Sequence, residues 1–134
     1  MVLDDSGAVT TIRFASTAPT AWRLSAFSGR LGEVTAVRGV FTFKMGSREN
    51  VRLVPEWGGG ALWDIGVYPM SYAQYIFGGP PEEVFGMQWL GDSGVDEIFS
   101  GQMRYASGAF AQLSCSFLTP FHTFVEITGT KGRL

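Results

Sequence analysis

Residues 56–79 read EWGGGALWDIGVYPMSYAQYIFGG, and the rest of the chain is arranged around this stretch. Three consecutive glycines open it, and apolar residues then recur at the three- and four-residue spacing of an amphipathic helix. A second glycine pair, followed by Pro80 and Pro81, ends it. Because Pro69 lacks a backbone donor, we expect a kink or a break just after Tyr68. The stretch therefore predicts a helix in two pieces.

The segments before this helix predict a short strand, a short helix, a long apolar strand and a loop. Val9–Phe14 is typical of a short strand and Pro19–Ser28 of a short helix. Glu33–Met45 predicts a long strand with apolar residues on both faces, so both faces should be covered. Gly46–Pro55 is polar and is predicted to be an exposed loop.

The segments after the helix all predict strands. They span residues 83–90, 95–105, 109–117 and 122–128, with short glycine-, serine- or proline-containing turns between them. Four strands joined in this way favour an antiparallel meander. Strands segregated from helices indicate an α+β fold, in which helices pack on one face of an open, predominantly antiparallel sheet.

Bulk composition limits the classes of function. The chain has 134 residues, a net charge of −2, 46% hydrophobic and 16% charged residues. This is one domain's worth of chain, apolar enough to suggest surface covered by a partner, with no charge that favours nucleic acid or a membrane surface. One cysteine and one histidine build neither a disulfide framework nor a metal cluster. Without a signal pattern or a membrane-spanning run, the expected setting is reduced and cytoplasmic.

Asp64 and Tyr68 are the residues most suited to acid–base chemistry. They lie four apart, so a helix presents them on one face. A phenol with the ordinary pKa of ~10 needs a nearby cation to act as a base at neutral pH, and the helical stretch contains none. The alternative is an aspartate in solvent beside a half-buried tyrosine.

The glycines and tryptophans around position 60 allow two interpretations. Gly59 and Gly60 could approach a ligand closely or simply turn the chain into the helix. Trp57 and Trp63 could cover a ligand or pack in a core or interface. The glycines match neither the Gly-x-Gly-x-x-Gly dinucleotide pattern after a strand nor a phosphate-binding loop.

Four further residues have a structural interpretation that is simpler than a functional one. His122 is expected to be structural or solvent-facing, and Cys115, which alternates with apolar residues, to be a small core residue. Arg48 and Arg52 could meet an anionic ligand, but a solvated loop accounts for them more simply.

Taken together, these residues resemble a known family. GGGALWDIGVYP (58–69) is similar to the signature of the glucose–fructose oxidoreductase, inositol dehydrogenase and MocA-like (Gfo/Idh/MocA) family, in its branch with tyrosine at the second catalytic position. That branch includes dimeric dihydrodiol dehydrogenase. SGRLGEV (28–34), SGVDE (93–97) and GTKGRL (129–134) also fit the family's C-terminal domain. The resemblance spans residues 19–134.

The resemblance implies that two domains have different functions. In the family a Rossmann domain binds NAD or NADP, and the C-terminal domain holds the substrate and forms oligomers through its sheet face. It implies that Asp64 orients a sugar, polyol or diol, and that Tyr68 is the acid/base, assisted by the lysine of a Glu-Lys-Pro motif. Trp57, Gly59, Gly60 and Trp63 would then be substrate contacts.

The chain departs from the complete family pattern. The Rossmann domain and its lysine are absent, residues 1–18 match poorly, and residue 134 precedes the domain's usual final strands. We therefore expect residues 19–134 to be an incomplete substrate-binding and oligomerisation domain that binds no cofactor and is inactive alone. One alternative is a stand-alone, self-associating module that has lost the chemistry. Another is an unrelated α+β ligand-binding domain.

Overall fold

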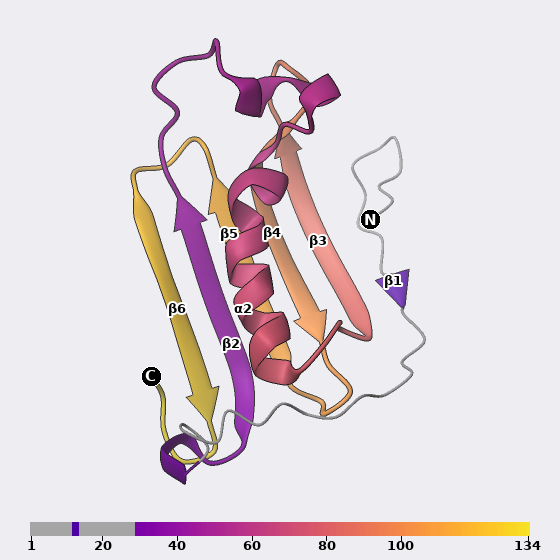
Figure 1. Cartoon of the computed structure of the whole chain (residues 1–134), viewed down its shortest axis with the longest axis vertical. Coiled ribbons are helices and arrows are strands. Elements are labelled where there is room, and N and C mark those ends of the chain that lie inside the picture. Colours follow the sequence, from indigo (N-terminus) through magenta and orange to yellow (C-terminus); the bar gives the residue numbers. More distant parts are fainter. Residues whose placement is uncertain (1–11, 14–28) are drawn as a thin grey trace.

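A mixed sheet covered on one face by a single long helix makes up the described part of the chain (Figure 1). The computed structural model describes residues 12–13 and 29–134. Its strands are β1 (Ile12–Arg13), β2 (Val34–Thr42), β3 (Glu83–Leu90), β4 (Asp96–Arg104), β5 (Phe110–Ser116) and β6 (His122–Gly129). Of the two N-terminal predictions, the helix over 19–28 lies outside the described residues, as does the predicted strand over 9–14 except at β1.

The strand order, β1-β3-β4-β5-β2-β6, confirms an open sheet but corrects the predicted meander. β3, β4 and β5 are joined as antiparallel neighbours, as predicted. β6 does not pair with β5, however, because β2 lies between them, parallel to β5 and antiparallel to β6. A strand with apolar residues on both faces suits an interior position in a sheet, and β2 lies inside the edge strand β6. Its parallel neighbour β5 needs the long crossover that residues 43–109 provide.

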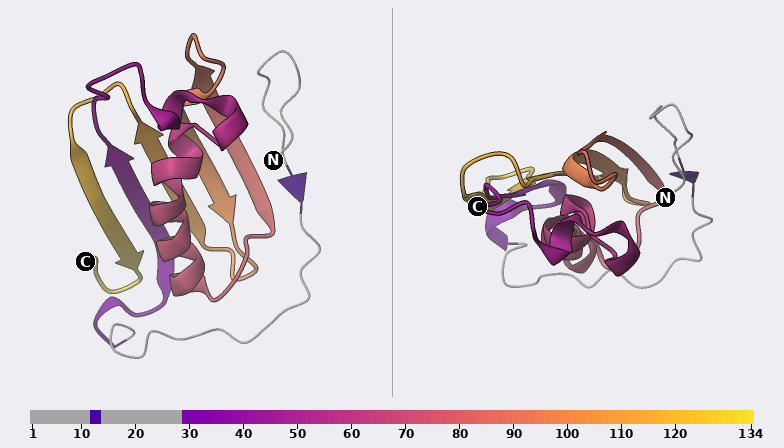
Figure 2. Two further views of the ribbon diagram at one scale, coloured as in Figure 1. Left: turned by 45° about the horizontal axis from the view of Figure 1, so that its top comes forward. Right: turned by 90° about the horizontal axis from the view of Figure 1, so that it is seen from above.

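The register of the ladders separates the two faces of the sheet. One row, Val84, Met103, Ala111, Val37 and Ile127, faces the helix and the core. A row three residues along each strand, Met87, Ser100, Ser114, Val40 and Phe124, faces the other way. Seen from above, the helix and the loop before it lie on one side of the sheet only (Figure 2). The opposite face is the open face.

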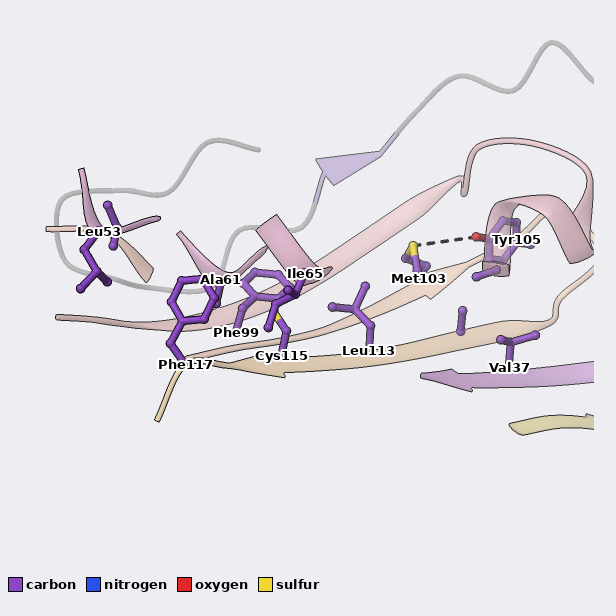
Figure 3. Close-up of a cluster of buried hydrophobic side chains, with 13 residues drawn as sticks. Val37, Leu53, Ala61, Ile65, Phe99, Met103, Tyr105, Leu113, Cys115 and Phe117 are labelled. Carbon is purple, nitrogen blue, oxygen red and sulfur yellow. Dashed lines mark hydrogen bonds between the residues drawn. The ribbon is translucent and has the colours of Figure 1, made fainter. Parts of the chain in front are cut away.

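The hydrophobic core lies between the helix and the middle of the sheet (Figure 3). Its buried members are Val37, Leu53, Ala61, Ile65, Ala73, Val95, Phe99, Met103, Tyr105, Ala111, Leu113, Cys115 and Phe117. Cys115 is completely buried and burial raises the pKa of its thiol to about 12, which agrees with the predicted core role.

The helix is continuous, which corrects the predicted break after Tyr68. A π-helical turn, η3 (Leu62–Gly66), runs directly into α2 (Val67–Phe77). The irregularity thus lies before Pro69 rather than after it. Because an i to i+5 turn widens the backbone just N-terminal to the proline ring, Pro69 fits without ending the helix.

The helix touches β2 most closely where Pro69 crosses Gly39. A Cβ atom at Gly39 would lie 2.4 Å from the Pro69 Cβ. A glycine in the interior of a central strand is otherwise unfavourable, so this contact gives Gly39 its physical reason. The crossing fixes the height of the helix above the sheet and, with it, the position of the side chains that the helix carries.

Candidate active site

The three glycines at the start of the helix are used for internal packing. Gly59 is partly buried, and a Cβ there would lie 2.6 Å from the Arg52 carbonyl oxygen. Gly60 is buried with a φ of 125°, and the Asp96 carboxylate occupies the space that its side chain would need. Their predicted contact with substrate stays a prediction, and neither residue forms part of an open cradle for a phosphate.

Asp96 and Glu97 anchor the segments around the helix start. Both belong to the stretch SGVDE (93–97), which resembles part of the Gfo/Idh/MocA C-terminal domain. The Leu62 N–H donates to Asp96 Oδ2 at 2.7 Å, so Asp96 caps the helix, and burial raises the pKa of this carboxyl. Arg48 donates two hydrogen bonds, of 2.7 and 2.6 Å, to Glu97, which is 1% exposed. These bonds lower the pKa of Glu97. Arg48 is therefore exposed in its loop, as predicted, and it also anchors that loop through Glu97, which was not predicted.

Asp64 lies in the π-helical turn, where an arginine from the preceding loop holds it. The Arg52 Nε donates to Asp64 Oδ2 at 2.6 Å. The Arg52 guanidinium also lies over the Phe43 ring, 6.0 Å from its centroid. Arg52 is therefore partly exposed in its loop, as predicted, but it also forms an ion pair that was not predicted. The pair escaped prediction because the two residues are twelve apart and belong to different elements.

Tyr68 lies one helical turn further on and remains half exposed. Its ring packs 5.6 Å from that of Phe41, which in turn meets Phe121 at 6.3 Å between centroids. Phe41 and Phe43 are two residues apart on the extended chain of β2, so they point to the same face. Arg52, the partner of Asp64, thus lies over Phe43, just beyond the end of β2, and Tyr68 packs beside Phe41 within β2. Half of the tyrosine surface (51%) stays accessible.

Both predicted tryptophans are at the surface. Trp57 ends the 3-10 turn η2 (Pro55–Trp57) and is 72% exposed, and Trp63 is 71% exposed. Trp63 lies close to Gly58, since a Cβ there would be 3.5 Å from the Trp63 Cδ1. Their exposure excludes a core role within the described part of the chain, and leaves two large aromatic faces near the start of the helix.

Other reactive side chains lie away from this arrangement. His122 is exposed and its register partner is Thr42, so it belongs to the open face with Phe124, whose ring lies 5.3 Å away. Within residues 12–13 and 29–134, no group of histidine, cysteine, aspartate and glutamate side chains is arranged to hold a metal ion. In that same part of the chain, no helix has the length and apolar character needed to cross a bilayer.

The glycine stretch at 58–60 does not fit a dinucleotide-binding loop. It precedes a helix but follows a 3-10 turn, not a strand, and internal groups fill the space beside Gly59 and Gly60. This stretch is therefore not where a dinucleotide cofactor would be held.

Comparison with known proteins identifies the family of this two-layer fold. A protein-family model described as the GFO/IDH/MocA C-terminal domain matches residues 23–134. The chain therefore belongs to the GFO/IDH/MocA family and represents its C-terminal domain. This confirms the family, and the fold class, that the stretch around Asp64 and Tyr68 predicted.

Individual relatives are sugar and diol dehydrogenases. The chain is 35% identical over 109 residues to D-xylose 1-dehydrogenase (NADP(+)) 2 of Haloferax volcanii, covering 80% of this chain and 33% of that protein. It is 29% identical over 107 residues to the trans-1,2-dihydrobenzene-1,2-diol dehydrogenase of Bos taurus, covering 78% of this chain and 31% of that protein. The crystal structure of aldose-aldose oxidoreductase from Caulobacter crescentus, complexed with glycerol, superimposes with a TM-score of 0.72 at 29% identity. That match covers 81% of this chain and 34% of the other. The chain thus spans about a third of the length of each relative.

Proposed function

We propose that this chain is the substrate-binding part of an NAD(P)-dependent oxidoreductase that acts on a hydroxyl group of a sugar, polyol or diol. The observation that carries the proposal is the placement of Asp64 and Tyr68. Both lie on one continuous helix, Asp64 held by Arg52 and Tyr68 half exposed beside Phe41 of β2. The names of the relatives support the class of substrate and cofactor.

In the proposed reaction, each of the two residues handles the substrate hydroxyl differently. The Asp64 carboxylate accepts a hydrogen bond from a hydroxyl and fixes the ring of the substrate. The Tyr68 oxygen, as the phenolate that a nearby cation would favour, takes the proton of the hydroxyl that is oxidised, while the carbon loses a hydride. A nicotinamide held by residues outside the described ones would accept that hydride. We expect this chain by itself to show no turnover.

The exposed tryptophans provide a surface suited to such substrates. Sugars and cyclic diols present an apolar ring face, which stacks on aromatic side chains, and hydroxyls at the ring edge. Trp57 and Trp63 offer two such faces near the start of the helix that carries Asp64. We propose them as substrate contacts.

Exchange of Tyr68 tests the proposal directly. The chain is joined to a cofactor domain of the family, and oxidation of a panel of sugars, polyols and diols is followed by NAD(P)H absorbance. Tyr68→Phe should lower kcat by roughly 10²- to 10⁴-fold, the contribution typical of an acid/base group. Tyr72→Phe is the matched control, because Tyr72 is also half exposed, one turn further along the same helix. Full turnover of Tyr68→Phe would refute the assigned role.

The open face of the sheet supports a second part of the proposal, self-association. Large apolar side chains remain exposed there, namely Phe85, Met87, Trp89, Ile98, Phe110 and Phe124. Large apolar side chains that remain exposed together on one face of a sheet commonly mark an interface. We propose that a second copy of the chain covers it, face to face.

Light scattering distinguishes a monomer from an oligomer. The natural chain should scatter as a dimer or larger, and Met87→Glu, which places a charge on the open face, should shift it to monomer. Val51→Glu is the control, since Val51 is equally exposed but lies in the loop turn η1 (Val51–Leu53). A natural chain that is monomeric at high concentration would argue against this interface.

A further inference from the structure

Arg52 is connected to the helix start by its main chain as well as its side chain. Its N–H donates to the side-chain oxygen of Asn50 at 3.0 Å, which caps η1. Its carbonyl accepts from the Gly60 N–H at 2.9 Å, and Gly60 is four residues before Asp64. Hydrogen bonds of Arg52 therefore join the loop that carries it to the helix that carries Asp64.

The side chain of Arg52 engages only one edge of the Asp64 carboxylate. Its Nε takes Oδ2, whereas Oδ1 has no hydrogen-bond partner among the residues that the structure describes. The carboxylate is partly exposed, with 28% of the side-chain surface accessible. One oxygen is thus anchored, and the other is left to accept a hydrogen bond from a ligand.

The Phe43 ring limits where the guanidinium can lie. Because the planar group rests over this ring while its Nε points at Asp64, rotation of the arginine would break one contact or the other. A lysine amine could carry the same charge but could not make both contacts in one plane. The geometry is therefore specific to arginine.

We infer that Arg52 is a positioning residue of the active site: it holds the Asp64 carboxylate in the orientation that binds the substrate hydroxyl. This inference rests on the proposed role of Asp64. A partly exposed ion pair contributes little to stability, with a median of about 0–1 kcal/mol, so stability alone gives a weak reason for the pair. Orientation of the substrate-binding Asp64 carboxylate by Arg52 is a stronger reason for the pair.

The test is a double-mutant cycle in the chain joined to a family cofactor domain. Arg52→Ala and Asp64→Asn should each lower kcat/KM for the best sugar, polyol or diol by roughly 10- to 100-fold, the cost of misplacing a binding group by about 1 Å. KM for NAD(P) should not change. If Arg52 acts through Asp64, the double variant should be no worse than Asp64→Asn alone.

Chemical rescue and conservative exchange separate orientation from a general structural effect. Added guanidinium ion, at concentrations far below those that unfold proteins, should restore part of the activity of Arg52→Ala but none of that of Asp64→Asn. Arg52→Lys, which keeps the charge, should remain impaired. Arg133→Ala is the matched control, because Arg133 is highly exposed and its one ion-pair contact, to Glu126, is long at 3.8 Å.

The results distinguish failure of the inferred role of Arg52 from failure of the proposed function. If Asp64→Asn and Tyr68→Phe impair turnover but Arg52→Ala does not, the inference fails and the proposed function stands. Additive losses, or no guanidinium rescue in a variant whose circular dichroism and thermal unfolding match the natural chain, also overturn it. If none of the three variants impairs turnover, the proposed function itself fails.

Discussion

Gly39→Ala tests whether the contact between the helix and β2 positions the helix. The added Cβ would lie 2.4 Å from the Pro69 Cβ and 3.2 Å from its Cα. Carbon atoms pack best at about 3.5–4.0 Å, so the two elements must separate by roughly 1 Å. Neither partner can yield by rotating, because one atom is a Cβ and the other belongs to a proline ring. Forcing extra carbon into a packed core costs about 1–3 kcal/mol.

Part of this cost is offset in the unfolded state. Replacing glycine with alanine restricts the unfolded chain and stabilises by about 0.4–1 kcal/mol where the fold can accept it. The net loss should therefore be about 1–2 kcal/mol, and each 1 kcal/mol corresponds to a fall in Tm of about 4 °C for a chain of this length.

Urea unfolding of the natural chain and of Gly39→Ala, followed by tryptophan fluorescence, measures this loss. Gly46→Ala is the matched control, because no atom lies within 4 Å of the Cβ that it adds. The control should remain within about 0.5 kcal/mol of the natural chain, the range of surface substitutions. If Gly39→Ala is equally unaffected, the helix is not held at the height that the Pro69 contact implies, and the reasoning is refuted.

Two further predictions concern titratable groups in the same layer. Arg48 lowers the pKa of Glu97, so the stabilisation from Glu97 is complete above the unfolded pKa of about 4.3 and is lost as the pH falls through the lower folded value. Glu97→Gln should be less stable than the natural chain near neutral pH, and the difference in urea midpoint should shrink on acidification; a constant difference would contradict this. Burial raises the pKa of Cys115 to about 12, so a thiol reagent should label the native chain only as fast as it opens. Rapid labelling in the absence of denaturant would show that the core there is open.

The hairpins of the sheet could be predicted from the sequence, but the place of β2 could not. β3, β4 and β5 follow one another with tight turns, and period-two alternation is a local signal. The pairing of β2 with β5 joins Ala36 to Phe110, and no local pattern specifies a partner so far along the chain. The apolar residues on both faces of β2 predicted that both faces are covered; the helix covers one face, and cover of the open face stays a prediction. No local pattern indicated between which strands β2 lies.

The candidate site was predictable only where it is local. The spacing of Asp64 and Tyr68 on one helix, together with the family resemblance, indicated the pair. Arg52 was interpreted as a solvated loop residue, because its contact with Asp64 depends on how η1 folds back towards the helix. The contact of Tyr68 with Phe41 depends likewise on where the helix crosses the sheet, which the Gly39 contact determines.

The insertion of β2 between β5 and β6 has a consequence for how the sheet forms. β6 pairs with β2, which is far away in the sequence: Thr35 and Thr128, joined by a hydrogen bond, are 93 positions apart. β6 does not pair with β5, the strand that precedes it in the chain. The meander of β3, β4 and β5 can assemble from neighbouring hairpins, but β2 and β6 can join only by closing long loops. Such non-local pairing slows folding. During refolding, we therefore expect the amides of β3, β4 and β5 to become protected from hydrogen exchange first. The amides of β2 and β6 should become protected last.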